Sequence, residues 1–223
     1  PRQIFGALKT ASAVLGIAMP DVYRSENVVG VEILPSYPPV IALGSDVFKD
    51  RTDQELGFLC GKRLTYFHPW HRLASIYNRD ALEVMFMAVA KLADPDFQLV
   101  LRQDLPKETR ETFGRSVGEA VATLEQVLAA DKRAELSQIM TKFWQRNTAP
   151  NISLWHRQLE LAADHAGLFV AGDVAAVGNV LKTEVAGPSK LGRRDKLQDL
   201  VLYVLSDRYV DLRRSMGTEI DHI

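Results

Sequence analysis

The amino-acid sequence predicts an α+β fold, mostly helical, with one small N-terminal sheet and about eight helices. Short β-branched runs occur only between residues 21 and 43, whereas most of the remaining chain spaces its apolar residues as amphipathic helices do. The 223 residues are 47% hydrophobic and 25% charged, which is typical of a chain that buries an ordinary globular core.

The N-terminal region is predicted to contain a helix followed by two or three strands. Residues 3–16 carry apolar residues at helical spacing and end in glycine. The runs at 28–34 and 39–43 are rich in Val and Ile, and the Pro35-Ser36-Tyr37-Pro38 turn separates them. These runs are the only β signal in the chain.

The next helix has a clear start, because Thr52 can act as N-cap and Glu55 completes a capping box. This helix is expected to end near Pro69. Further helices are predicted from residue 79 to Pro95, at 112–130 and 132–145 as a hairpin, from Asn151 or Ser153 to Gly167, from an Asp173 cap, and at 196–215. The stretch at 188–196 is interpreted as a basic surface loop. We expect residues 1–223 to form a single domain, excised from a longer protein.

The charge balance argues against several function classes. The 27 basic and 28 acidic residues give a net charge of −1, so no global field attracts nucleic acid or an anionic membrane. The sequence has no long uncharged apolar stretch, so we expect no membrane insertion. The single cysteine, Cys60, lies in an apolar run and is expected to be inert, which favours a reducing, cytoplasmic location.

One residue does not fit a simple amphipathic helix. Projection of the helix that starts at Thr52 places Arg63 inside the arc of Leu56, Leu59, Cys60 and Phe67, with Lys62 and Tyr66 on its flank. A buried cation needs an acidic partner, because an unpaired charge outside water is costly. The best candidates are Glu160 and Asp164, one turn apart at the border of the apolar face of helix 155–167.

At these residues the chain resembles the HtpX-like and CAAX-prenyl-protease-like family of gluzincin metallopeptidases. The resemblance spans roughly residues 11–170 and implies a zincin-like fold. The family's second motif, Glu-x-x-Ala-Asp-x-x-Gly, is matched at Glu160, Ala163, Asp164 and Gly167. Its first motif, Gly-His-Glu-Leu-x-His, aligns with Gly61-Lys62-Arg63-Leu64-Thr65-Tyr66.

The alignment places Lys62 and Tyr66 at the two histidine ligand positions and Arg63 at that of the catalytic glutamate. Zinc needs neutral imidazoles on one helix face, and the glutamate accepts a proton from metal-bound water. Lys62, Arg63 and Tyr66 supply neither function near neutral pH. We therefore expect no metal, no other cofactor and no peptidase activity, and an ion pair from Lys62 or Arg63 to Glu160 or Asp164 in place of the metal.

The sequence also allows an alternative metal site. His68, His71 and His156 with Glu160 form an alternative metal set, which would make the chain a hydrolase or metallopeptidase with non-standard ligands. The sequence contains no Gly-x-Ser-x-Gly elbow and no P-loop.

The favoured function is that of a pseudoenzyme, a protein-interaction or scaffolding module of a larger bacterial-type assembly or regulatory protein. The family resemblance implies an added-strand peptide groove, and the matching edge is Val40, Ile41, Ala42 and Leu43. Another possibility is a purely structural domain without a groove. The sequence does not identify the protein partner.

Overall fold

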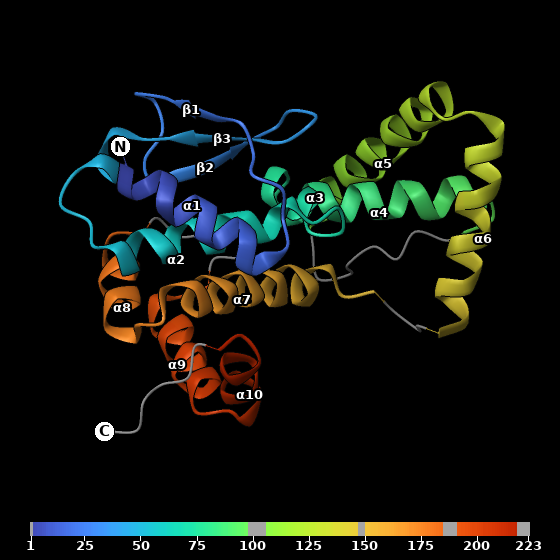
Figure 1. Ribbon diagram of the computed structural model, residues 1–223. Helices are drawn as coiled ribbons and strands as arrows, with labels where there is room; N and C mark the ends of the chain where they lie inside the picture. The colour runs from blue at the N-terminus through green and yellow to red at the C-terminus, as the bar shows by residue number, and fades with distance from the viewer. Residues whose placement is uncertain (1, 98–105, 147–149, 185–190, 218–223) are drawn as a thin grey trace. The chain divides into compact units, whose positions relative to one another are not determined.

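The computed structural model describes residues 2–97, 106–146, 150–184 and 191–217 (Figure 1). The chain divides into two compact units. Unit 1 contains Pro1–Ile76 and Leu154–Ile223, and unit 2 contains Tyr77–Ser153. The mostly helical α+β class is as predicted, with ten α-helices and three strands in the described residues. That the whole chain is a single zincin-like domain stays a prediction.

The sheet of unit 1 has the strand order β1-β3-β2. Strand β3 (Val40–Leu43) pairs in parallel with β1 (Val22–Arg24) and antiparallel with β2 (Val31–Leu34). The prediction that Val40, Ile41, Ala42 and Leu43 form an open edge is therefore wrong. Strand β3 has a strand on each side, and Ile41, Ala42 and Leu43 are buried. Val40 is only partly buried, but its backbone is also paired with β2.

Helix α2 (Asp53–Leu64) is the central element of unit 1. Its start is as predicted, because Thr52 and Glu55 form a complete capping box. It packs against α1 (Arg2–Leu15), and Figure 1 shows the two helices between the sheet and α7 (Ile152–Ala171). Side chains on almost every face of α2 are buried, among them Leu56, Phe58, Cys60, Lys62 and Leu64. A short 3-10 turn (Thr65–Phe67) and α3 (Arg72–Ile76) follow.

Helices α2 and α7 meet at glycines. A Cβ atom added to Gly61 would lie 2.9 Å from Val170 Cγ2, and one added to Gly167 would lie 2.7 Å from the Phe58 carbonyl oxygen. Neither position has room for a side chain. The two backbones are therefore in close contact next to Lys62 and Asp164.

Three helices complete unit 1: α8 (Val174–Thr183), α9 (Arg193–Val204) and α10 (Asp207–Ser215). Asp173 caps α8 as predicted, accepting hydrogen bonds from the backbone N–H groups of Ala175 and Ala176. The single helix predicted for 196–215 is instead two helices, and Ser206 caps the second. Leu200 of α9 is buried in the main core with Leu168 and Val180.

Unit 2 contains α4 (Arg79–Ala93), α5 (Lys107–Val127) and α6 (Ala130–Arg146). The two helices predicted at 112–130 and 132–145 are present as α5 and α6, but each packs mainly against α4, so the predicted hairpin between them is wrong. Four aromatic rings pack together in this unit, those of Phe86, Phe97, Phe143 and Trp144. Among the described residues of the chain, no helix is both long and apolar enough to cross a bilayer.

Candidate functional site

Five charged side chains of unit 1 form a buried cluster, which we call the lysine–carboxylate cluster. Lys62 comes from α2, Glu160 and Asp164 from α7, Glu184 from the C-terminal end of α8, and Lys196 from α9. The residues Lys62, Glu160, Asp164 and Lys196 are all at most 4% exposed. The cluster therefore joins four segments in the interior of the unit.

Each lysine of the cluster contacts more than one carboxylate. Lys62 Nζ lies 2.6 Å from Asp164 Oδ1 and 2.6 Å from Glu184 Oε1. Lys196 Nζ lies 2.5 Å from Glu160 Oε1, 3.2 Å from Glu184 Oε2 and 4.0 Å from Asp164 Oδ2. Two ammonium groups thus connect three carboxylates. Both donate a hydrogen bond to Glu184, and such charge-assisted hydrogen bonds are strong.

Burial and pairing shift the pKa values of the cluster in opposite directions. Burial raises the pKa of Asp164, although Lys62 and Lys196 both oppose the shift. Burial also acts to raise the pKa of Glu184, but Lys62, Lys196 and Arg63 together outweigh it and the net pKa is lowered. For Lys196, burial acts to lower the pKa. The carboxylates of Asp164, Glu160 and Glu184 together raise it by more, so the net pKa is raised.

The predicted ion pair between the two helices is present as Lys62 with Asp164. Glu160 also lies in the cluster, where it contacts Lys196. The placement of Arg63 in the buried arc is wrong, since its side chain is 27% exposed. Its Nε donates to the Val31 carbonyl oxygen and its Nη2 lies 2.7 Å from Glu32 Oε1. Buried side chains occupy most faces of α2, and the face that carries Arg63 lies against β2.

Tyr66 is buried beside the cluster, as a member of a small apolar group with Ala74, Leu159 and Ala163. Burial, followed by the Glu160 carboxylate, raises the pKa of its phenol. Cys60 is buried as predicted, and burial raises the pKa of its thiol to about 12. Neither group is ionised near neutral pH, so neither is an activated nucleophile.

The alternative ligand set is not brought together. His71 Nδ1 lies 3.2 Å from the Thr65 carbonyl oxygen, and His156 Nε2 lies 3.3 Å from that of Ala74. His68 stacks on Trp70, and Glu160 is paired with Lys196. Within the residues that the structure describes, no three His, Cys, Asp or Glu side chains are arranged to hold a metal ion.

Two members of the cluster were missed at the sequence level, Lys196 and Glu184. Lys196 was assigned to a basic surface loop, but it lies on α9 and is buried. A signal was available, because Lys196, Leu200 and Val204 recur every four residues and so share one helix face. No comparable pattern surrounds Glu184, which follows the last residue of α8.

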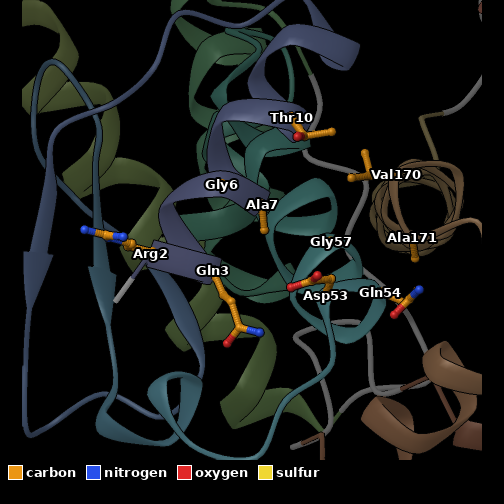
Figure 2. Close-up of a pocket in the computed structure, with 10 residues that line it drawn as sticks. All are labelled: Arg2, Gln3, Gly6, Ala7, Thr10, Asp53, Gln54, Gly57, Val170 and Ala171. Carbon is orange, nitrogen blue, oxygen red and sulfur yellow. The ribbon is translucent and has the colours of Figure 1, made fainter.

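A cavity of about 540 Å³ lies elsewhere in unit 1, as Figure 2 shows. It lies between α1, the first turns of α2 and the end of α7, and none of the cluster residues lines it. Its lining includes Arg2, Gln3, Thr10, Asp53 and Gln54. The cavity and the charged cluster are therefore separate features.

Comparison with known proteins gave no relative: no family model, no curated protein and no solved structure matches this chain. The resemblance to gluzincin metallopeptidases stays a prediction. The chemistry of the site has to be argued from its own side chains.

Proposed function

We propose that the protein is a catalytically inactive zincin-like domain that acts by binding another protein. In this proposal the lysine–carboxylate cluster replaces a zinc centre. The observation that carries it is the position of the Lys62 and Lys196 ammonium groups, within 2.6 Å of Asp164 and Glu160. Fixed cations occupy the space in which a metalloenzyme would hold its metal among carboxylate and imidazole ligands.

The chemistry of the lysine and arginine side chains supports an inactive site. A protonated amine has no lone pair to offer a metal, and it repels a dication. The raised pKa of Lys196 keeps that amine protonated throughout the neutral range. Arg63 cannot act as a general base there, and its guanidinium is already bound to Val31 and Glu32.

Rebuilding the metal site would test the inactive-site proposal. The variant combines Lys62→His, Arg63→Glu, Tyr66→His and Lys196→Ala, which restores the histidines and frees Glu160. The wild-type protein should retain no Zn²⁺ after gel filtration, whereas the rebuilt variant should retain one equivalent by metal analysis. Adding Glu160→Gln should weaken that binding by about tenfold or more, because a ligand is lost.

Two results would contradict the proposal. Stoichiometric Zn²⁺ binding by the wild type would show that the lysines do not replace the metal. A rebuilt variant that folds, as judged by circular dichroism, yet retains no Zn²⁺ would show that the geometry is not zincin-like.

The protein-binding part of the proposal is supported by the outer edge of β2. Gly44 N–H donates to the Gly30 carbonyl, and the antiparallel register then places Glu32 in a hydrogen-bonded pair with Ala42. By alternation, the backbone groups of Val31 and Ile33 point away from β3. Arg63 already donates to the Val31 carbonyl. Ile33 therefore offers the groups to which an extended peptide can add as a strand.

A phage-displayed library of random peptides provides the test of this edge. Peptides selected on the wild-type protein should lose binding to Ile33→Pro, because proline removes the outward N–H without removing a bond to β3. Selected peptides that bind Ile33→Pro equally well would exclude the β2 edge as the binding surface. The Zn²⁺ experiment is independent of this result.

A further inference from the structure

Helix α9 is apolar on two faces. Its inner face carries Leu200, which is fully buried, and Lys196, which belongs to the cluster. Its outer face carries Val201, Leu202 and Leu205, and Leu205 is 75% exposed. A surface helix normally has a polar outer face, so exposed apolar residues at this spacing indicate an interaction surface.

An open depression of about 510 Å³ lies on the outer face of α9, lined by Arg193, Arg194, Leu197, Gln198, Val201 and Leu202 of this helix. Arg193, Leu197 and Val201 form one row of residues four apart, and Arg194, Gln198 and Leu202 form the next. Residues four apart form the ridges and grooves of a helix surface. The space between two such rows is where a side-chain ridge of another helix packs.

The N-terminal end of this groove is positively charged. Arg193 and Arg194 line it, and within the described part of the chain neither has a carboxylate partner. The N-terminus of a helix dipole adds partial positive charge at the same end. The groove thus combines apolar side chains with two guanidinium groups that have no carboxylate partner among the described residues.

We propose that the α9 groove, defined by Arg193, Arg194, Leu197, Gln198, Val201 and Leu202, binds an amphipathic helix of another protein. The bound helix presents an apolar ridge to Leu197, Val201 and Leu202 and acidic side chains to the two arginines. The proposal is independent of the β2 edge and of the metal question.

Two other occupants fit less well. A bilayer surface requires a broad basic face, whereas α9 also carries Asp195 and Asp199 and the whole chain has a net charge of −1. A second copy docking through the same groove would set its own arginines against Arg193 and Arg194, because none of the residues that line the groove is acidic. An acidic helix satisfies both the shape and the charge of the groove.

The inner contacts of α9 support its role as a fixed platform. Lys196 ties it to Glu160 of α7, and Asp199 Oδ2 lies 2.6 Å from His165 Nε2, also on α7. The His165 ring stacks on Tyr203 with centroids 3.9 Å apart. Binding sites on rigid elements are more precise than those on loops.

The test uses a yeast-displayed library of helical peptides that vary Leu, Ala, Glu and Lys, sorted on the full chain. Enriched peptides should carry Glu beside a leucine ridge. Their affinity should fall by about tenfold or more on Leu202→Ser and on the charge reversal Arg193→Glu with Arg194→Glu. Peptides with Glu changed to Lys should regain binding to the reversed variant. Val127→Ser, at an exposed apolar residue of α5, should change nothing.

The opposing results are distinct. No enrichment, or enriched peptides insensitive to Leu202→Ser and to charge reversal, would overturn the proposal. A concentration-dependent dimer in analytical ultracentrifugation that Leu202→Ser abolishes would assign the groove to a second copy instead. Binding to phosphatidylserine vesicles that the reversed variant loses would assign it to a lipid surface. The Ile33→Pro variant, whether or not it loses the peptides that bind the β2 edge, should give the same results in these α9 experiments.

Discussion

The buried cluster of unit 1 and the surface ion pairs of unit 2 use the same chemistry in opposite environments. In the cluster, Lys62 is 4% exposed and contacts two carboxylates. On α6, Lys132 is 62% exposed and lies 2.9 Å from Glu135 Oε2. Both are lysine–carboxylate pairs at hydrogen-bonding distance, so distance alone does not distinguish them.

Burial is what separates the two regions. An exposed pair gains little, because water screens the attraction and holding two long side chains in place costs entropy. A buried pair has lost its hydration, so each charge depends on its partner. The cluster therefore constrains the structure far more than the surface pairs do, whether or not it adds net stability.

The largest expected effect is that of Lys62→Met. The variant leaves the buried Glu160 and Asp164 and the partly buried Glu184 with Lys196 as their only lysine in the cluster. Breaking a buried pair typically costs about 3–5 kcal/mol. The free energy of unfolding should fall by that amount, measured by urea denaturation with hydrogen exchange at the α7 amides, which report on unit 1. The matched change Lys132→Met should leave the urea midpoint of unit 2 unchanged. Equal effects of the two changes on stability would show that burial does not make the Lys62 pair more important than the Lys132 pair.

Replacing the whole cluster by apolar residues should raise the free energy of unfolding of unit 1 or leave it nearly unchanged. The variant combines Lys62→Met, Lys196→Met, Glu160→Leu, Glu184→Leu and Asp164→Val. Since no unpaired charge remains, unit 1 should be as stable as the wild type or more stable by about 1–4 kcal/mol, by the same urea measurement. A less stable variant would show that the ion pairs themselves contribute net stability.

The pH dependence of stability should report on the buried Lys196. Its folded pKa is raised above 10.5, so its contribution is fully present below that pH and declines as the pH rises through the raised value. The stability difference between wild type and Lys196→Met should therefore shrink above pH 10.5, measured by urea denaturation at stepped pH. Glu184 behaves oppositely: its lowered pKa gives a contribution that is lost as the pH falls below 4.5 through the folded value. A difference that stays constant to the alkaline limit would contradict the raised pKa.

The smallest effect is expected for Arg63→Ala. Arg63 is half-exposed and its partner Glu32 is more exposed still, so their ion pair contributes about 1 kcal/mol or less. The variant should fold with nearly unchanged stability in urea denaturation. It should also free the Val31 carbonyl at the β2 edge, so peptides selected for that edge should bind no more weakly. A loss comparable to that of Lys62→Met would place Arg63 in the cluster energetically.

Local patterns predicted local structure well. The Thr52 capping box, the Asp173 cap and the division between α5 and α6 all follow from residues within a few positions of one another. Helix periodicity also located two of the three carboxylates and one lysine of the cluster. The sequence predicted an ion pair from Lys62 or Arg63 to Glu160 or Asp164, and the structure contains the pair of Lys62 with Asp164.

The errors concern contacts between distant segments. Strand order depends on which runs pair across the sheet, and the sequence does not show that β1 covers the far side of β3. Arg63 was misplaced because a projection assumes one buried face, whereas α2 is enclosed by several elements. Lys196 and Glu184 reach the cluster through the packing of α8 and α9. Helix spacing indicates that Lys196 lies on a buried face, but no local pattern shows which carboxylates it meets or that Glu184 joins them.

The glycine contact between α2 and α7 links uncharged positions to charged ones. The backbones at Gly61 and Gly167 are close enough that a side chain at either would push the helices apart. Such a shift would lengthen the 2.6 Å bond between Lys62 and Asp164, which lie beside this contact. Among natural variants of this chain, the two glycines and the charged residues should therefore covary, so that loss of either glycine accompanies loss of the buried charges.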